Sequence, residues 1–324
     1  MNILVTGGSG FIGTNYIEYL LELKGINILN LDKEQPRNPD HMKYWKKCDL
    51  LDVLAVNFIV SEFAPTHVVH LAAETGVDKK LLKDFATNID GVENLISALS
   101  KIDTIQRVIF TSSLLVCKMG YVPDHDTDYQ PSTAYGESKV EGEKIVRNAQ
   151  IDSFRWTIIR PISIWGPWFK EPYKNFFKAI SQGWYFHIGD GHYFRSLGYV
   201  KNICHQIHMI LNVEANMVNK KTFYVADYKP SDLHDMSELI RESVSARNIR
   251  SLPVFLMKIT AWVGDLVKAI GWTSFPISSF RLKNIRTEYI FDLSSIEKIT
   301  GPLRYDLRAG VEETISWMKD NNEL

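Results

Sequence analysis

The sequence predicts an α/β protein with a Rossmann-like, doubly wound parallel sheet and a smaller α/β domain in its C-terminal half. Apolar runs of strand length alternate with stretches that repeat apolar residues at helical spacing, which is the pattern of successive βαβ units. A glycine-rich turn lies directly behind the first apolar run, and an acidic residue ends the second. Together these observations indicate an open sheet with a ligand site at the carboxyl ends of its strands.

The first apolar run, Ile3–Val5, leads into the turn Gly7-Gly8-Ser9-Gly10-Phe11-Ile12-Gly13. Glycine at three of these positions removes Cβ atoms that would hold a phosphate away from the backbone, and the following helix aims unpaired N–H groups at it. Glycines are also common in ordinary turns, so the context decides. The second run ends at Asp32, about twenty residues after the last glycine, as in a dinucleotide-binding unit. Asp32 is expected to bind the ribose of NAD and to repel the 2′-phosphate of NADP.

Two later strand ends have features of the same cofactor site. Asp49-Leu50 follows a short predicted strand, and Asp49 is expected to cap a helix over Leu51–Phe63 or to bond the adenine amino group. The apolar strand Thr66–Leu71 is followed by Ala72-Ala73, whose small side chains would let a cofactor pass close to the backbone. These residues predict another wall of the cofactor cleft.

The residues that carry chemistry follow the fifth predicted strand, Arg107–Thr111. Ser112 and Ser113 end this strand at the carboxyl edge, where open α/β sheets bind ligands. Tyr135 and Lys139 are four residues apart, so they lie on one face of a helix. A nearby ammonium favours the phenolate and lowers its pKa, which would let Tyr135 exchange a proton with a substrate alcohol near neutral pH. Of the fourteen tyrosines, only Tyr135 has a lysine four residues later.

Composition limits the class of protein and its partners. A chain of 324 residues that is 45% hydrophobic can form one large domain with a smaller one attached. The net charge of -1, without a long block of one sign, leaves no electrostatic footprint for nucleic acid, so a small molecule is the expected partner. Cys48, Cys117 and Cys204 are odd in number and far apart, which is typical of reduced thiols, and the chain begins without a secretory signal. We therefore expect a cytoplasmic protein.

No metal site is expected. His205 and His208 are three apart on a predicted helix, but they have no acidic partner at ligand spacing, so they are interpreted as structural.

The chain resembles an extended short-chain dehydrogenase/reductase of the NAD-dependent epimerase/dehydratase family. The matching pieces, in the family's order, are Thr6 to Gly13, Asp49-Leu50, His70-Leu71-Ala72-Ala73, Ser112-Ser113, Tyr135 to Lys139, Arg160-Pro161, Trp165-Gly166-Pro167, and Gly189-Asp190-Gly191 leading to Arg195. The resemblance implies that Ser113 orients the reacting oxygen and Tyr135 moves the proton. It also implies that Lys139 tunes Tyr135 and binds the ribose, and that Pro161 lies near the nicotinamide.

The resemblance also suggests which residues bind the substrate, and the positions that differ from the family pattern limit the reactions to be expected. Arg195 matches the family's diphosphate-binding arginine, whose planar fork suits two phosphate oxygens. Arg281 or Arg286 is a candidate second clamp. Ser163 takes the place of an asparagine that contacts the substrate diphosphate in galactose epimerases. Leu114 and Leu115 stand where dehydratases have Asp-Glu, so dehydration is not expected.

Three functions remain open. The leading hypothesis is an NAD-dependent nucleotide-diphosphate-sugar 4-epimerase or 4-keto reductase with a Ser-Tyr-Lys site, and Asp32 favours epimerisation through its preference for NAD. The alternatives are a 3β-hydroxysteroid-type or other lipophilic alcohol dehydrogenase, and a non-catalytic NAD-binding sensor.

The expected domains are a dinucleotide-binding core at residues 1–165, with returning segments near 195–228, and a mainly substrate-binding domain at 166–194 and 229–324. By resemblance, helices over Asp84–Ser100 and Ala134–Asn148 would pair across a homodimer. Their apolar faces are equally consistent with covering the sheet.

The most apolar helical stretch is Pro253–Trp272. Lys258, Asp265 and Lys268 interrupt it, whereas a membrane-spanning helix needs about twenty uncharged residues. We expect a helix packed on the substrate-binding domain. A helix lying on a membrane surface is the alternative, and it would suit an enzyme acting on a lipid-linked sugar or on a steroid.

Overall fold

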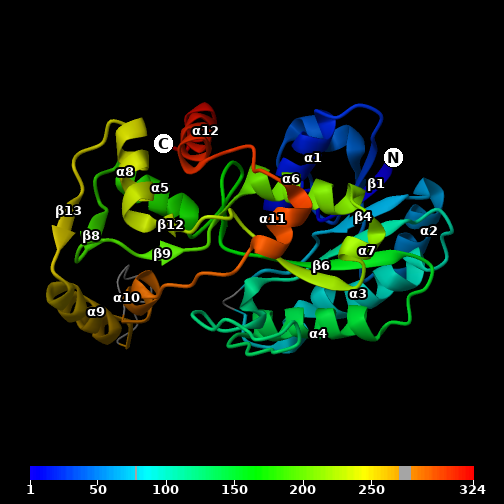
Figure 1. Ribbon diagram of the computed structural model, residues 1–324, viewed down its shortest axis with the longest axis horizontal. Helices are drawn as coiled ribbons and strands as arrows, with labels where there is room; N and C mark the ends of the chain where they lie inside the picture. Colours follow the sequence, from blue (N-terminus) through cyan, green and yellow to red (C-terminus); the bar gives the residue numbers. More distant parts are fainter. Residues whose placement is uncertain (77–78, 270–278) are drawn as a thin grey trace. The chain divides into compact units, whose positions relative to one another are not determined.

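A computed structural model describes residues 1–76, 79–269 and 279–324 of the protein (Figure 1). The chain forms two compact units. The first contains residues 1–168, 198–228 and 292–304, and the second contains 169–197, 229–291 and 305–324. The segment 292–304, assigned above to the mainly substrate-binding part, therefore groups with the first unit.

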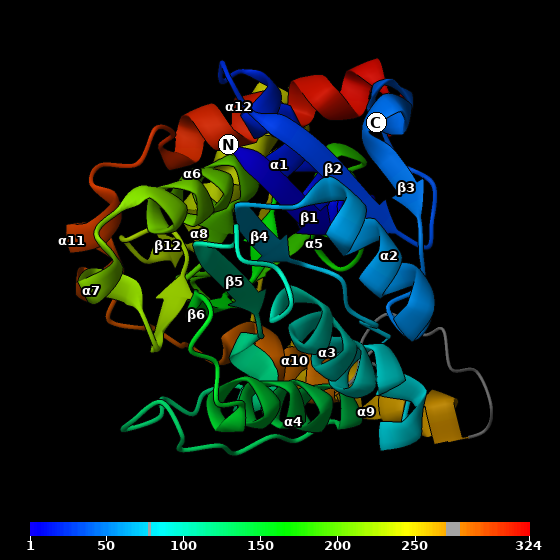
Figure 2. The same cartoon turned by 90° about the vertical axis from the view of Figure 1, so that its right-hand side faces the viewer.

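The first unit is built on a seven-stranded sheet with the order β11-β6-β5-β4-β1-β2-β3. Its strands are β1 (Asn2–Thr6), β2 (Asn27–Asp32), β3 (Trp45–Lys47), β4 (His67–His70), β5 (Arg107–Thr111), β6 (Arg155–Pro161) and β11 (Lys221–Val225). Every pairing is parallel. The strand order reverses between β1 and β4, and Figure 2 shows the sheet running from β3 to β6 across this switch point. The predicted fold class is thus confirmed, and the switch point is where such sheets bind ligands.

Helices cover both faces of this sheet, with α1 and α6 on one side and α3 and α4 on the other (Figure 1). The helices of the unit are α1 (Phe11–Leu21), α2 (Val53–Phe63), α3 (Ala86–Leu99), α4 (Ala134–Asn148), α6 (Val200–Asn212), α7 (Ala215–Val218) and α11 (Ser294–Thr300). Short 3-10 turns are η1 (Pro39–Tyr44), η2 (Leu82–Phe85) and η3 (Leu114–Val116), and a small pair joins β7 (Ile164–Trp165) to β10 (Gly198–Tyr199). The central strands β1, β4, β5 and β6 are buried on both faces over almost their whole length, whereas the edge strand β3 is largely exposed.

The core between the sheet and α2, α3 and α4 is aliphatic. Val56, Leu95 and Val146 from these helices pack with buried strand residues such as Val108 and Ile158. Each fully buried aliphatic side chain of this kind contributes roughly 1.5–3 kcal/mol. This packing holds α4 against the sheet, and α4 carries two of the predicted catalytic residues.

The start of α2 differs from the prediction. Asp52 caps the helix by accepting a hydrogen bond from the Ala55 amide at 3.0 Å, so α2 begins at Val53. Asp49 instead accepts from the Leu51 amide at 3.0 Å and closes a turn before the helix. Both aspartates suit a cap, and the sequence alone did not distinguish them.

The second unit combines short strand pairs with helices. Its elements are α5 (Tyr173–Ser181), β8 (Phe186–Ile188), β9 (Phe194–Arg195), β12 (Ser231–Asp232), α8 (Leu233–Ser243), β13 (Arg250–Leu252), α9 (Val254–Ala269), α10 (Ser279–Arg286) and α12 (Leu307–Asp320). Strand β13 pairs with β8 in parallel, and β12 pairs with β9 in antiparallel orientation. Among the helices of the described ranges, none combines the length and the apolar character needed to cross a membrane.

Candidate active site

The glycine turn between β1 and α1 is closed by a hydrogen bond from the Gly10 amide to the Gly7 carbonyl at 3.0 Å. Gly7 has a φ of +74°, and a Cβ there would lie 2.4 Å from the Ala72 amide nitrogen. A Cβ on Gly13 would lie 2.2 Å from the Gly7 oxygen, whereas a Cβ on Gly10 would meet only that oxygen, at 3.1 Å. Packing therefore requires glycine at 7 and 13. At Gly10 packing does not strictly require glycine. The lack of a side chain there is therefore consistent with space for a bound group.

The turn delivers the N-terminus of α1 to the carboxyl edge of the sheet. Gly10 is the N-cap and supplies no side-chain cap, and the helix starts at Phe11 as predicted. The first amides of a helix, here from Phe11, Ile12 and Gly13, have no partner within the helix itself. Their N–H groups and the helix dipole favour an anion at this end, so the residues present fit the diphosphate of a dinucleotide.

Asp32 ends β2 beside the glycine turn and is tied to it. Its carboxylate accepts hydrogen bonds from the Ser9 amide at 3.0 Å and from the Glu34 amide at 2.9 Å. The Ser9 hydroxyl in turn donates to the Glu34 carbonyl at 2.9 Å. Burial raises the pKa of Asp32, and the two backbone hydrogen bonds oppose that shift. A carboxylate has about four acceptor positions, so two amides leave capacity for ribose hydroxyls.

The other predicted cofactor residues also follow the carboxyl ends of parallel strands. Asp49 and Leu50 come after β3, Leu71 to Ala73 come after β4, and Pro161 ends β6. The Leu71 amide donates to the Thr6 carbonyl at 2.9 Å, which joins the end of β4 to the end of β1. Leu50 is buried in the core, so its side chain acts in packing.

The structure brings Ser113 and Tyr135 together. Ser113 follows β5 and caps η3 by accepting from the Leu115 amide at 3.1 Å. Thr133 caps α4 by accepting from the Gly136 amide at 3.0 Å, which puts Tyr135 in the first turn of that helix. A side-chain hydrogen bond links Ser113 to Tyr135.

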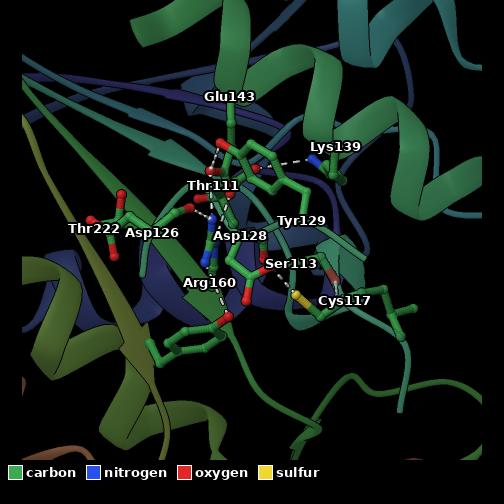
Figure 3. A network of polar contacts seen from close by, with 12 residues as sticks. Thr111, Ser113, Cys117, Asp126, Asp128, Tyr129, Lys139, Glu143, Arg160 and Thr222 are labelled. Carbon is green, nitrogen blue, oxygen red and sulfur yellow. Dashed lines mark hydrogen bonds and ion pairs between the residues drawn. The ribbon is translucent and has the colours of Figure 1, made fainter. Parts of the chain in front are cut away.

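Lys139 lies one turn farther along α4 and is buried. Its Nζ donates to the Thr111 carbonyl at 3.0 Å, so the ammonium is held at the end of β5, the strand that leads into Ser113 (Figure 3). The three predicted catalytic residues are therefore grouped around one strand end. They come from two elements only, β5 with its following turn and α4.

The pKa of Tyr135 departs from its ordinary value in the direction opposite to the sequence prediction. Burial raises the pKa of Tyr135 to about 12, although the hydrogen bond with Ser113 lowers it in part. Burial likewise lowers the pKa of Lys139 to about 8, against the attraction of the Glu143 carboxylate. The predicted lowering of the Tyr135 pKa is not seen in the protein alone, because loss of hydration at the buried phenol dominates.

A buried ion pair fixes α4 to β6 directly behind these residues (Figure 3). The Arg160 guanidinium donates to both carboxylate oxygens of Glu143 at 2.8 Å, and both side chains are almost fully buried. Arg160 also donates to the Asp126 carbonyl at 2.6 Å and to the Tyr224 hydroxyl at 3.0 Å. The sequence analysis missed Glu143. Its signal was the four-residue spacing after Lys139, which places it on the same helical face.

The predicted substrate residues occupy different units. Ser163 belongs to the first unit and has a φ of +44° in the turn between β6 and β7. Arg195 ends β9 in the second unit, and its guanidinium lies over the Tyr289 ring at 5.1 Å from the ring centre. Arg281 falls within α10, but its side chain lies outside the described residues.

The second unit also contains a histidine cluster that the sequence analysis did not consider. His187 and His192 each stack on His234, with ring centres 4.3 and 4.4 Å apart. His187 pairs with Glu238 at 3.2 Å and His192 with Asp232 at 2.5 Å. These contacts join β8 and the segment after it to β12 and the first turns of α8.

Comparison with known proteins shows which family has this arrangement. The model of the family described as "NAD dependent epimerase/dehydratase family" matches residues 3–226. The chain belongs to this family. The match covers the glycine turn, Asp32 and the Ser113, Tyr135 and Lys139 positions, and it confirms both the resemblance and the predicted class of NAD(P)-dependent oxidoreductase or epimerase.

Two curated relatives are similar to this chain over nearly their whole length. An N-acetyl-alpha-D-glucosaminyl-diphospho-ditrans,octacis-undecaprenol 4-epimerase from Escherichia coli O157:H7 is 28% identical, covering 98% of this chain and 95% of its own. A decarboxylating sterol-4-alpha-carboxylate 3-dehydrogenase from Schizosaccharomyces pombe is 24% identical over 98% of each chain. A UDP-glucuronic acid 4-epimerase from Bacillus cereus in complex with NAD has a TM-score of 0.75 at 19% identity, covering 99% of both chains, and therefore shares the fold.

Proposed function

We propose that the protein is an NAD-dependent 4-epimerase of a nucleotide-diphosphate sugar. The observation that carries this proposal is the grouping of Ser113, Tyr135 and Lys139 at the end of β5, in the same unit as the glycine turn and Asp32. The two 4-epimerases among the similar proteins support the choice of reaction. The absence of Asp-Glu after Ser113 argues against dehydration.

In the proposed mechanism Ser113 donates a hydrogen bond to the reacting sugar oxygen and positions it against the Tyr135 hydroxyl. In the oxidation step Tyr135 acts as the phenolate and takes the hydroxyl proton as the ring carbon becomes a ketone, and the phenol so formed gives the proton back when the carbon is reduced. The phenolate form requires the positive charges of Lys139 and of the bound cofactor to lower the pKa of Tyr135 from its raised value in the protein alone. Lys139 holds positive charge beside this exchange and binds the cofactor ribose. The glycine turn and Asp32 would hold NAD, which would supply the hydride acceptor and donor for the ring carbon.

The residues of the cofactor turn support NAD over NADP. Asp32 lies where the ribose 2′-hydroxyl would be bonded, and a carboxylate repels a 2′-phosphate. A 4-epimerase regenerates its NAD in each turnover, whereas a 4-keto reductase consumes reduced cofactor from solution. The cofactor preference therefore favours epimerisation.

Absorbance at the NADH band separates the two reactions. Purified protein is incubated with added NADH and UDP- or GDP-sugars, and separately with added NADH and a nucleotide-diphosphate 4-keto sugar, and the sugar is analysed in parallel. Interconversion of the two C4 epimers without steady loss of NADH is expected. Steady NADH consumption would instead identify a 4-keto reductase.

A lipophilic alcohol is the second candidate substrate, because the sterol dehydrogenase from S. pombe is similar over the whole chain. Arg195 discriminates the two classes, since a guanidinium in the substrate site suits a diphosphate and not an uncharged steroid. Arg195→Ala should abolish nucleotide-sugar binding, while Arg250→Ala, at an exposed position in the same unit, should not. Retained nucleotide-sugar binding in Arg195→Ala would favour the lipophilic substrate.

Three further expectations belong to this proposal. We propose that the second unit supplies most substrate contacts, with Ser163, Arg195 and Arg281 among them. We propose a homodimer that pairs α3 and α4, for which sedimentation velocity should give twice the 37.2 kDa of one chain. The three cysteines are unpaired and buried, which supports a reducing, cytoplasmic location.

A further inference from the structure

Helix α9 has two apolar faces, and the fold uses only one of them. Met257 and Ala261 are buried and pack with Ile188 and Leu282 of the same unit. This contact agrees with the expected packing of the helix on its own unit. Six other large apolar side chains of the helix are between 41% and 62% exposed, namely Phe255, Leu256, Ile259, Trp262, Val263 and Leu266.

The six exposed side chains form one continuous strip, called here the α9 face. Phe255, Ile259, Trp262 and Leu266 follow the i, i+4, i+7, i+11 spacing of a single helical stripe, and Leu256 and Val263 lie beside it. At about 100° per residue, all six fall within roughly 120° of the helix circumference, opposite Met257 and Ala261. A surface helix normally places charged residues on that side. Contiguous exposed apolar surface of this kind marks an interaction site.

The charge around the α9 face is positive. Between residues 250 and 290 the sequence has six Lys and Arg against two Asp and Glu, although the whole chain has a net charge of -1. Arg250, Lys258, Lys283 and Arg286 are all exposed there. An anionic bilayer would attract these side chains, whereas a second copy of the chain would bring a like-charged surface against them.

The residue types favour a bilayer as well. Trp262 and Phe255 are each 62% exposed, the highest values on the helix, and aromatic rings of this kind insert at the boundary of headgroups and acyl chains. Lys258 and Asp265 lie along one edge of the strip, where their charged ends can stay in water. The helix has 16 residues and carries these charges, so it is suited to lie in the interface.

We propose that α9 binds the protein to the surface of an anionic membrane, with the α9 face in the interfacial layer and the neighbouring basic residues on the headgroups. This inference rests on the geometry and charge of the second unit and is independent of the proposed epimerase reaction. Binding is reversible, because one amphipathic helix buries little apolar area compared with a spanning helix.

Vesicle co-sedimentation of the full chain tests the proposal. The protein is expected to sediment with vesicles of phosphatidylcholine and phosphatidylglycerol, to bind more weakly to phosphatidylcholine alone, and to be released in part by salt. The double variant Phe255→Ser with Trp262→Ser should bind roughly tenfold or more weakly. Phe58→Ser is the matched control, because Phe58 is a 65% exposed aromatic residue on α2 in the first unit, and it should bind like wild type.

A second variant keeps the test valid if the double variant does not fold, as judged by circular dichroism. Lys283→Glu with Arg286→Glu changes only exposed charges and should remove the preference for phosphatidylglycerol. Failure of the wild-type protein to sediment with anionic vesicles would overturn the proposal, as would equal binding by the double variant. A wild-type dimer that the double variant converts to monomers, without lipid binding by either, would assign the α9 face to a second copy.

Discussion

Tyr135, the proposed proton-transfer residue, lies in the first turn of α4. This position determines both its hydrogen-bond partner and its burial, and burial in turn determines its protonation state. Thr133 caps the helix so that Tyr135 meets Ser113, and burial keeps the phenol protonated at neutral pH with a pKa of about 12. Such a group is ready to donate a proton to a keto oxygen. Removing the hydroxyl while keeping the ring therefore tests the proton transfer separately from packing.

Tyr135→Phe is expected to lower kcat by roughly 10²–10⁴-fold, which is the usual contribution of a positioned acid or base. Cofactor affinity should change little, because Lys139 still holds its position through the Thr111 carbonyl. Steady-state kinetics with the true substrate, alongside an NAD titration, measure both quantities. Unimpaired turnover in Tyr135→Phe would contradict the mechanism.

His70 makes folding stability depend on pH. Burial lowers the pKa of His70 to about 3, and its Nδ1 is hydrogen-bonded to the Thr6 hydroxyl at 2.7 Å. Between pH 6.5 and 3 the unfolded chain binds a proton at this position and the folded chain does not, so the free energy of unfolding falls as pH is lowered. At pH 5 the loss is about 2 kcal/mol relative to pH 7 or above.

Urea unfolding at pH 7 and pH 5 measures this effect. His70→Asn can keep a polar contact to Thr6 and should lose about 2 kcal/mol less than wild type between the two pH values. His67, with a pKa lowered to about 4, adds to the fall in both proteins. An identical pH dependence in the two proteins would show that the pKa of His70 is the same in the folded and unfolded chains, against the lowered value expected here.

The Arg160–Glu143 pair offers a comparison of a buried and a surface carboxylate on one helix. Glu143→Ala leaves the Arg160 guanidinium buried without its bidentate partner and should cost about 3–5 kcal/mol of unfolding free energy. Glu141→Ala breaks a pair with Lys144 on the exposed side of α4, which should cost less than about 1 kcal/mol. Denaturant titration of both variants compares them directly, and similar losses would contradict the structural role of Glu143.

At the scale of elements, the alternation of strands and helices was readable because the central strands β1, β4, β5 and β6 are buried over almost their whole length. Strand β5 and helix α4 have the predicted bounds, since their ends are marked by Ser112-Ser113 and Thr133. The first residue of α2 could not be predicted from the sequence, because both Asp49 and Asp52 are suitable N-cap residues. In the structure Asp52 is the cap. The pKa of Tyr135 also depends on burial, which no spacing of two residues reveals.

In the glycine turn, substitutions at Gly13 and Gly10 can separate an effect on stability from an effect on ligand binding. Gly13→Ala places a Cβ 2.2 Å from the Gly7 oxygen, so the turn must shift, and the expected cost is about 1–3 kcal/mol of stability. Gly10→Ala meets that oxygen at 3.1 Å, so it should fold with a smaller loss. If a diphosphate sits against Gly10, Gly10→Ala should still bind NAD at least roughly tenfold more weakly.

Thermal unfolding and isothermal titration of the two glycine variants separate these effects. A Gly10→Ala protein with normal stability and normal NAD affinity would show that the phosphate lies elsewhere. Equal destabilisation by both substitutions would instead indicate that Gly10 serves packing, as Gly7 and Gly13 do.

For the whole molecule, the functional residues of the first unit were predicted well from the sequence, and those of the second unit were predicted poorly. The first unit carries the cofactor turn and the Ser113, Tyr135 and Lys139 group, and its signals are local spacings along successive strand ends. In the second unit Arg195 was named by resemblance, and a helix lying on a membrane surface was only the alternative for residues 253–272. The histidine cluster was not predicted. The uncovered face of α9 depends on the packing of Met257 and Ala261, and the cluster depends on contacts between residues far apart in the sequence.

Because the proposed cofactor contacts all belong to the first unit, NAD should stabilise the chain by mass action. At a concentration of about 100 times its Kd, NAD should add about 2.7 kcal/mol to the unfolding free energy. NADP at the same concentration should add clearly less, because Asp32 repels its 2′-phosphate. Asp32→Asn removes that repulsion and should bring the two cofactors closer together in effect. Denaturant unfolding followed by circular dichroism measures all four combinations, and equal stabilisation of the wild-type chain by NAD and NADP would exclude Asp32 as the selecting residue.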